Sequence, residues 1–295
     1  MGEERFHQAH DAPLGIVAGN GALPQMVLEG ARDAGRNIVM AGLRGEVEQG
    51  LLARANAGQE FALGSLGAIT QYLTAQGCRE VIFIGGVSKA RLFNHLKLDR
   101  GALKVLWRLR SFQDDHGLRI IAGLFEEAGL QVLDARLYLQ NATIPEGVMT
   151  QKIKPTRQQK QDIQFGFELL RHLSPMDVGQ TLVVRGGVIL AVEAIEGTNA
   201  CIQRAGELGS HGKHPLGANG LVVIKGTKDG QDTRLDLPTI GPKTIEVASE
   251  AQVKVIAVEA ERTLLVKAEK TLRMCEDAGI ALVGVRIVRE SETHG

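Results

Sequence analysis

Short apolar runs alternate with helical patterns along the first half of this 295-residue chain, and this alternation limits the fold most strongly. Residues 14–18, 37–43 and 81–84 are nearly continuous apolar runs of strand length. Apolar residues at helical spacing follow the first run, and residues 65–76 have an amphipathic pattern. Nearly continuous apolar runs are typical of strands that are covered on both faces of a sheet. The first half is therefore predicted to be a Rossmann-like parallel sheet packed between helices.

The periodicity lapses between residues 141 and 155, where Pro145, Gly147 and Pro155 interrupt regular structure. A chain of this length is expected to form two domains. We predict a disordered lead-in over 1–13, a nucleotide-binding domain over 14–145, a linker over 146–155 and a second domain over 156–290.

The second half has a different pattern, in which β-branched runs alternate with separate helices. Residues 181–184 and 188–192 flank Gly186 and Gly187, which predicts a short hairpin. The other expected helices cover 103–109, 115–128, 156–172, 244–251 and 268–278, and the other expected strands cover 131–137, 221–225, 234–237, 253–258 and 280–287. The pattern indicates an α/β protein whose second domain is α+β with a mixed sheet.

Composition narrows the classes of function. The chain has 34 basic and 34 acidic residues without a long basic run, which argues against a nucleic-acid partner. Cys78, Cys201 and Cys275 are far apart in the sequence, so a disulfide framework is not expected and a cytoplasmic location fits best. Since no apolar run reaches about 18 residues, we expect any contact with a membrane to be peripheral.

Two glycine turns follow the first and third apolar runs. The turn at residues 19–21 precedes a helical segment, where backbone N–H groups and the helix dipole attract phosphate. Ligands of parallel sheets often bind beside the first strand, so the two turns favour a nucleotide pocket. A plain tight turn remains the alternative, because no third glycine completes the dinucleotide fingerprint. The candidate residues are Gly19, Asn20, Gly21, Ala22, Gly85, Gly86 and Lys89.

The segment from Lys225 to Gly241 concentrates charge. Asp232, Arg234 and Asp236 are two residues apart, so in a β-strand they would project from one face. Carboxylates hold metal ions and arginine binds anions, which suits a site for a metal and phosphate oxygens. A solvated edge strand, whose charges discourage edge-to-edge pairing, is the alternative.

Two glutamates occur in apolar surroundings after the expected hairpin. Glu193 and Glu196 lie in the run AVEAIEGT, and a carboxylate buried there needs a partner, a metal or an altered pKa. We interpret both as functional and as candidate metal ligands. Thr198 has an alternative role as the cap of the following helix.

Other polar residues have simpler explanations. Asp114 and Asp115 are interpreted as the cap and first turn of a helix, with metal binding as the less favoured alternative. His211 and His214 lie in a glycine-containing segment, where a solvated loop is favoured over a metal site.

Four segments together resemble a known bacterial family across nearly the whole chain. They are residues 18–24 (AGNGALP), 177–180 (DVGQ), 193–198 (EAIEGT) and 231–241 (QDTRLDLPTIG). The chain resembles the LpxI-type UDP-2,3-diacylglucosamine pyrophosphatases of lipid A biosynthesis. It departs from the usual pattern at Asn20, where the family carries glycine, and at Asn199, where the family carries aspartate.

The resemblance implies a two-domain enzyme that binds its substrate in the cleft between the domains. The implied reaction is metal-assisted hydrolysis of the diphosphate of UDP-2,3-diacylglucosamine to UMP and 2,3-diacylglucosamine 1-phosphate, with water attacking the sugar-side phosphorus and Mg²⁺ or another divalent cation assisting. Asp236 is implied to be essential, as metal ligand or as general base. The other residues in the assignment are Asp232, Arg234 and Lys225 as catalytic, Gln180, Gly197, Thr198, Thr239 and Gly241 as substrate-binding, and Glu193 and Glu196 as metal ligands with Asp236.

Two other classes of function compete with this hydrolase. A non-catalytic carrier of a sugar nucleotide or lipid would bind the same ligand without turnover. An oxidoreductase would use the first glycine turn for a nicotinamide, and the incomplete fingerprint makes it the least favoured. A small-molecule substrate, peripheral contact with the inner membrane and a homo-oligomer are all compatible with the sequence.

Overall fold

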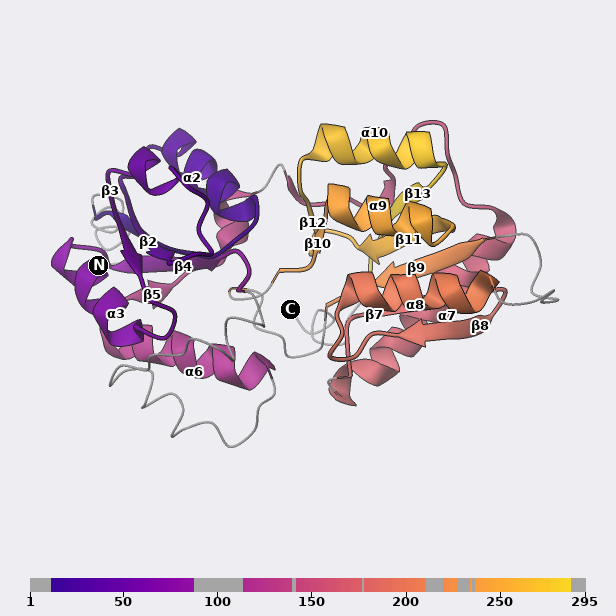
Figure 1. Ribbon diagram of the computed structural model, residues 1–295, viewed down its shortest axis with the longest axis horizontal. Coiled ribbons are helices and arrows are strands. Elements are labelled where there is room, and N and C mark those ends of the chain that lie inside the picture. Colours follow the sequence, from indigo (N-terminus) through magenta and orange to yellow (C-terminus); the bar gives the residue numbers. More distant parts are fainter. Residues whose placement is uncertain are drawn as a thin grey trace, which may run out of the picture. The chain divides into compact units, whose positions relative to one another are not determined.

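The chain divides into two compact units in the computed structural model (Figure 1). Of the residues that the structure describes, the first unit contains those up to 139 together with Arg234, and the second contains the others. The structure describes residues 12–87, 114–139, 142–176, 178–210, 220–227, 234 and 237–287. Several predicted features lie outside these residues: the lead-in over 1–11, the helix over 103–109, Lys89, Asp177, His211, His214, Asp232 and Asp236.

The first unit is built on a parallel sheet. Its strands are β1 (Leu14–Ala18), β2 (Ile38–Leu43), β3 (Ala57–Phe61), β4 (Glu80–Ile84) and β5 (Gln131–Val132). Their order is β3-β2-β1-β4-β5, and every neighbouring pair is parallel. Strands β1 and β4 are adjacent, so the two glycine turns lie at the same edge, and the predicted Rossmann-like sheet is confirmed.

Helices cover both faces of this sheet. They are α2 (Leu23–Asp33), α3 (Leu66–Ala75) and α6 (Asp114–Glu127). Ile69 of α3 and Phe125 of α6 pack in one core with Val17 and Val39. Helix α2 lies on the other face, as Figure 1 shows, and buries Val27 against the sheet. Side chains therefore leave each strand alternately toward the two layers.

Two predictions for the first unit need correction. Strand β3 was not anticipated, because it is an edge strand whose middle residues are exposed and its sequence AGQEF is mostly polar or small. The strand expected over 131–137 ends at Val132. The chain then turns into a short 3-10 helix, η2 (Ala135–Tyr138), and the Asp134 carboxylate accepts a hydrogen bond from the Arg136 N–H at 2.8 Å.

The second unit has a six-stranded mixed sheet, as predicted. In chain order its strands are β6 (Gly147–Val148), β7 (Thr181–Arg185), β8 (Val188–Val192), β9 (Leu221–Lys225), β11 (Val253–Glu259) and β13 (Ala281–Val285). They are ordered β6-β13-β11-β9-β7-β8, with β9, β11 and β13 parallel to one another, β7 antiparallel to β9, and β8 antiparallel to β7. A separate parallel pair joins β10 (Thr239–Ile240) to β12 (Leu264–Leu265).

The helices of the second unit are divided between the faces of its sheet. Helix α7 (Arg157–Leu173) packs Phe167 against Leu182 and Ile224 on one face. Helices α8 (Thr198–Ser210), α9 (Pro242–Glu250) and α10 (Ala268–Ala278) cover the other face, where Ile202 packs with Val223. Because strand side chains alternate, Lys225 belongs to the α8 face. A short 3-10 helix, η4 (Ser174–Met176), follows α7.

A buried carboxylate fixes the predicted hairpin. Gly186 and Gly187 have φ angles of 58° and 77°, which the tight turn between β7 and β8 requires. Asp162 of α7 is 1% exposed and accepts hydrogen bonds from both glycine N–H groups at 2.8 Å. The turn is therefore attached to α7.

The strand expected over 234–237 is wrong at the positions that the structure describes. Arg234 lies in a turn, Leu237 lies outside any strand, and the regular pairing begins at Thr239. Pro238 explains part of this difference, because it offers no N–H to a ladder and restricts the residue before it.

Of the described helices, none has the length and apolar character needed to cross a membrane.

Candidate functional site

Polar side chains gather where the parallel strands of the second unit end. Lys225 is the last residue of β9, and it is paired in the ladder with Thr181, the first residue of β7. The Glu193 N–H donates to the Thr181 carbonyl at 2.8 Å, which places Glu193 beside them. The carboxyl edge of parallel strands is the usual location of ligand sites in open α/β sheets.

Thr198, the first residue of α8, connects these groups. Its hydroxyl accepts a hydrogen bond from Lys225 Nζ at 2.7 Å and lies 3.3 Å from both carboxylate oxygens of Glu193. It also lies 3.2 Å from the Thr181 hydroxyl. One hydroxyl proton and two lone pairs satisfy all three contacts when Thr198 donates to Glu193. We call Thr181, Glu193, Thr198 and Lys225 the lysine cluster.

The lysine cluster holds two opposite charges away from water. Lys225 is 5% exposed and Glu193 is 7% exposed. Buried charges are costly unless they are paired and hydrogen-bonded, and Thr198 links the two. An ammonium held in this way is suited to bind an anionic oxygen, because little reorganisation is needed when the ligand arrives. The burial that the sequence predicted for Glu193 is confirmed.

Gln180 precedes the cluster and has an unfilled acceptor. Its backbone carbonyl accepts the Gly226 N–H at 3.0 Å, so it lies beside the end of β9. Among the described residues, nothing donates a hydrogen bond to the buried Gln180 Oε1. Buried polar atoms normally have partners, so this oxygen is available to a ligand donor.

The surroundings predicted for Glu196 are wrong. Glu196 is exposed, pairs with Arg204 at 2.6 Å and accepts the Ala194 N–H at 3.0 Å. The hydrogen bond from Arg204 lowers the pKa of this carboxyl. Both oxygens therefore have partners, and Glu196 is a poor candidate for a metal ligand. No three metal-ligating side chains come together within the described ranges, which do not include Asp236.

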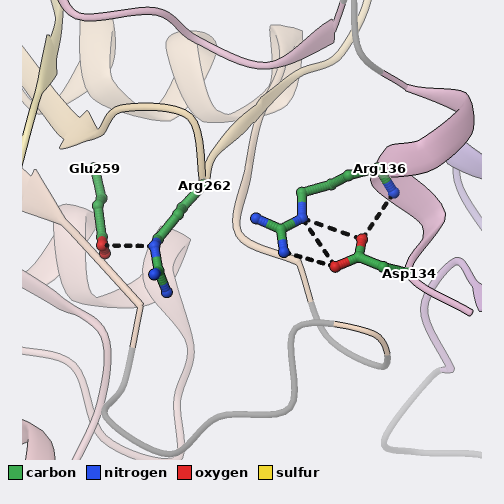
Figure 2. Close-up of polar contacts among 4 residues, drawn as sticks. All are labelled: Asp134, Arg136, Glu259 and Arg262. Carbon is green, nitrogen blue, oxygen red and sulfur yellow. Dashed lines mark hydrogen bonds and ion pairs between the residues drawn. The ribbon is translucent and has the colours of Figure 1, made fainter. Parts of the chain in front are cut away.

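A second polar group at the same sheet edge was missed from the sequence. Glu259, the last residue of β11, is 3% exposed and accepts hydrogen bonds from the Thr227 N–H, at 2.9 Å, and the Thr227 hydroxyl. Arg262 Nε lies 3.3 Å from the other oxygen of Glu259. Figure 2 marks this ion pair with a dashed line. We call Thr227, Glu259 and Arg262 the Glu259 clamp. The sequence of residues 259–262, EAER, is typical of a surface turn. The apolar β11 residues before it are the one sequence signal that favours burial of Glu259.

Thr239 and Gly241 shape the entry into α9. Thr239 pairs with Leu264 in the small two-stranded sheet, and the Gly241 carbonyl accepts the Thr244 N–H at 3.0 Å in the first turn of the helix. A Cβ on Gly241 would lie 3.3 Å from Val266. Gly197 has a φ of 84° directly before α8, a conformation that favours glycine. The local roles of Gly241 and Gly197 are thus to start helices beside the strand ends.

The structure brings the two glycine turns of the first unit together. Asn20 and Gly86 form a bridge with N–H to carbonyl distances of 2.8 and 3.1 Å. A Cβ on Gly19 would lie 2.3 Å from the Gly86 carbonyl, so close approach of the turns requires glycine there. The bridge occupies two of the N–H groups that were expected to face phosphate. Gly21 and Ala22 follow the bridge and lead into α2, whose N-cap is Ala22.

Asn20 has an acidic partner that the sequence did not reveal. Its amide nitrogen donates to Glu46 Oε2 at 2.6 Å, and Glu46 follows β2 in a buried position. Acidic groups after the second strand of such sheets commonly bind ribose hydroxyls. No residue of β2 itself is acidic, and the loop position of Glu46 concealed it.

Arg234, which belongs to the first unit, contacts other residues of that unit. Its Nη1 lies 3.1 Å from Glu126 of α6 and 3.4 Å from the Val132 carbonyl of β5. Nearby along the chain, Asp134 binds the Arg136 guanidinium through both carboxylate oxygens, and this bond raises the pKa of Arg136 (Figure 2). The described partners of Arg234 are thus a surface carboxylate of α6 and a backbone carbonyl at the end of β5.

A separate hollow of about 700 Å³ lies at the other edge of the second sheet. Arg185, Glu207 and Lys254 line it, and it adjoins the start of β9 at Leu221. Since Lys225 ends that strand, the hollow is distinct from the lysine cluster.

Comparisons with known proteins cover almost the entire chain. The LpxI N-terminal domain model matches residues 13–142, and the LpxI C-terminal domain model matches residues 145–283. The chain is 34% identical to the UDP-2,3-diacylglucosamine pyrophosphatase LpxI of Caulobacter vibrioides over 275 residues, which is 92% of this chain and 97% of that protein.

Solved structures give weaker likenesses. The biotin carboxylase subunit of pyruvate carboxylase has a TM-score of 0.27 at 11% identity, over 59% of this chain and 35% of that one. The N5-carboxyaminoimidazole synthetase of Staphylococcus aureus complexed with ADP has a TM-score of 0.24 at 13% identity, over 67% and 44%. These scores are too low to support an argument.

Proposed function

Since the chain belongs to the LpxI family, we propose that it hydrolyses the diphosphate of UDP-2,3-diacylglucosamine in lipid A biosynthesis. The products would be UMP and 2,3-diacylglucosamine 1-phosphate. The observation that carries the proposal is the 34% identity, across both units, to a relative named for this activity. The buried Lys225 and Glu193 of the lysine cluster support it, because the reaction needs fixed charge around an anionic diphosphate.

The proposed chemistry is displacement at the sugar-side phosphorus. A water oxygen forms the new bond to that phosphorus, the bond to the bridging oxygen breaks, and UMP leaves with the bond electrons. Lys225 would neutralise the diphosphate, whose charge otherwise repels water. Asp236 would accept the water proton or hold a metal.

We further propose that Mg²⁺ takes part. Glu193 fits as an oxygen ligand because its buried carboxylate directly follows β8 at the sheet edge, and Asp236 is the other candidate. Glu196 does not fit, since Arg204 and the Ala194 N–H occupy its oxygens. When bound, the cation would stabilise charge that develops on the phosphoryl oxygens.

The two ends of the substrate call for different surroundings. We assign the uridine half to the Asn20–Gly86 turns of the first unit, where Glu46 offers an acceptor for ribose hydroxyls. We assign the acyl chains to the rim of the lysine cluster, where Ile195 is 86% exposed and Val178 is also exposed. Gly179 brings these segments together, because a Cβ there would lie 2.1 Å from the Glu193 carbonyl. Exposed apolar side chains beside a site that cleaves the diphosphate of a lipid substrate are suited to acyl chains or a membrane surface.

A comparison of binding with turnover tests the proposal. Purified protein is mixed with UDP-2,3-diacylglucosamine in detergent micelles with and without Mg²⁺, and products are identified by mass spectrometry. We expect UMP and the lipid 1-phosphate to appear only with the divalent cation. Saturable binding with intact substrate would instead identify a carrier protein.

A further inference from the structure

The end of strand β9 is held at three consecutive residues by three different elements. Lys225 donates to Thr198 of α8, the Gly226 N–H donates to the Gln180 carbonyl before β7, and Thr227 is bound by Glu259 of β11. A strand end commonly frays, because its last groups lose their ladder partners. The chain therefore leaves β9 in one fixed direction.

The restraint comes from both faces of the sheet. Lys225 lies on the α8 face, whereas Glu259 shares a face with Val255 and Ala257, which pack on the α7 side. Gly226 lies between them, and a Cβ there would be 2.8 Å from Leu170 of α7 and 3.6 Å from Glu259 Oε2. A side chain at Gly226 would require the tip of Leu170 to move, and the contacts on both faces fix the end of β9 from which Lys225 projects.

The acceptor capacity of Glu259 is used in a specific way. One oxygen, Oε2, receives both the N–H and the hydroxyl of Thr227, and the other faces Arg262. Hydrogen bonds to an ionised carboxylate are stronger than neutral ones, and Arg262 offsets the cost of burying the charge. The Glu259 carboxylate thus holds Thr227 in place more strongly than a backbone hydrogen bond between strands would.

We propose that Glu259 is a positioning residue for catalysis. By holding Thr227 it fixes the end of β9, from which the Lys225 ammonium projects. This inference rests on the proposed function, and it assigns Glu259 no contact with substrate.

The chain supplies a matched control in Asp162. Like Glu259 it is an almost fully buried carboxylate that accepts backbone N–H groups, from Gly186 and Gly187. Asp162 acts at the other end of the strands, because β7 begins beside Lys225 and ends at the hairpin that Asp162 holds. Removing either charge is expected to lower stability, but only one should affect the chemistry.

Glu259→Gln and Asp162→Asn are compared by steady-state kinetics and by thermal unfolding. For Glu259→Gln we expect kcat to fall by about a hundredfold with KM changed by less than about threefold, as expected when a catalytic group is displaced by about 1 Å. For Asp162→Asn we expect a similar loss in melting temperature and kcat within about twofold of wild type.

Thr227 provides the conservative rescue. Thr227→Ser keeps the hydroxyl and should retain wild-type kcat. Thr227→Val should lower kcat almost as much as Glu259→Gln does. The double variant Glu259→Gln/Thr227→Val should be no slower than the slower single variant, because the two residues act as one unit.

A substrate-independent readout separates this inference from the proposed function. Amide hydrogen exchange at residues 225–227 should accelerate in Glu259→Gln and stay unchanged in Asp162→Asn. A wild-type protein that does not hydrolyse the substrate would overturn the proposed function alone. Wild-type kcat, or unchanged exchange at 225–227, in a folded Glu259→Gln variant would overturn the positioning role.

Discussion

Lys225 is the residue whose chemistry the fold explains most directly. An ammonium at 5% exposure is retained only where something offsets its lost hydration, and Thr198 and Glu193 supply that offset. The side chain is thus prepared for a second anionic partner, which the proposed diphosphate provides.

Replacing Lys225 tests whether its charge serves catalysis. Lys225→Met should lower kcat/KM for UDP-2,3-diacylglucosamine by about 10²–10³-fold, the effect of losing one fixed stabilising charge. Lys243→Met is the control, because Lys243 of α9 is exposed and makes a surface ion pair with Glu246. Equal activity of both variants in a UMP-release assay would remove Lys225 from the mechanism.

Sequence patterns revealed some of these residues and concealed others for physical reasons. Glu193 stood out because a carboxylate between apolar residues is expected to be buried with them, and a buried carboxylate needs a partner. Glu196 lay in the same run, but the chain leaves the strand there and lets it reach Arg204. Glu259 and Glu46 were concealed, because loops and strand ends carry carboxylates routinely and burial depends on the tertiary fold.

Among the elements, the β7–β8 hairpin depends on one buried carboxylate. Asp162→Ala should lower the free energy of unfolding by about 2–4 kcal/mol, because two glycine N–H groups would lose their acceptor. Urea denaturation of the variant measures the change. Glu168→Ala, at an exposed position of the same helix, should stay within about 0.5 kcal/mol of wild type. Equal stabilities for the two variants would refute this role.

The loop between β8 and α8 tests the lipid part of the proposal. Ile195→Ser should raise KM about tenfold for the diacyl substrate, since one buried isoleucine contributes about 1.5–3 kcal/mol. Hydrolysis of a water-soluble analogue without long acyl chains should be unchanged. Leu208→Ser is the control, at an exposed apolar position near the end of α8. A uniform loss on both substrates would show that Ile195 acts on structure rather than on lipid binding.

The buried strands were predictable, and so was the exposed hairpin strand β8, because its β-branched run flanks a glycine turn, but the edge strands β3 and β6 were not. Strands β1, β2, β4, β9 and β11 are covered on both faces, so the middle of each is an apolar run. Strand β3 is exposed along most of its length and carries no such signal. The alternation of Asp232, Arg234 and Asp236 resembled a strand, yet Arg234 lies in a turn, because alternating charges do not by themselves supply a ladder partner.

For the whole molecule, the buried thiols predict how stability depends on pH. Burial raises the pKa of Cys201 and Cys275 to about 12 and that of Cys78 to about 11. Unfolded thiols lose their protons near pH 9, so above that pH the folded state binds more protons than the unfolded state.

Stability should therefore be unaffected by the thiols below pH 9 and should fall as pH rises toward 11–12. Each thiol contributes about 1.4 kcal/mol per pH unit in this window. Urea denaturation at a series of pH values measures the slope. Cys201→Ala should reduce that slope by one proton, and an unchanged slope would contradict the burial of Cys201.

The proposed function assigns a different part of the substrate to each unit. The first unit has the strand order and glycine turns of nucleotide-binding sheets, and the second holds the buried charges. Family membership accounts for both, because the two domain models match the two halves of the chain. Neither unit alone is expected to hydrolyse the substrate.

Hydrolysis in ¹⁸O-labelled water tests the central claim most directly. Wild-type protein, Mg²⁺ and UDP-2,3-diacylglucosamine should give unlabelled UMP and a lipid 1-phosphate that carries one ¹⁸O, while Asp236→Ala should bind the substrate and release no UMP. The absence of UMP from the wild-type reaction, or ¹⁸O in UMP, would contradict the account.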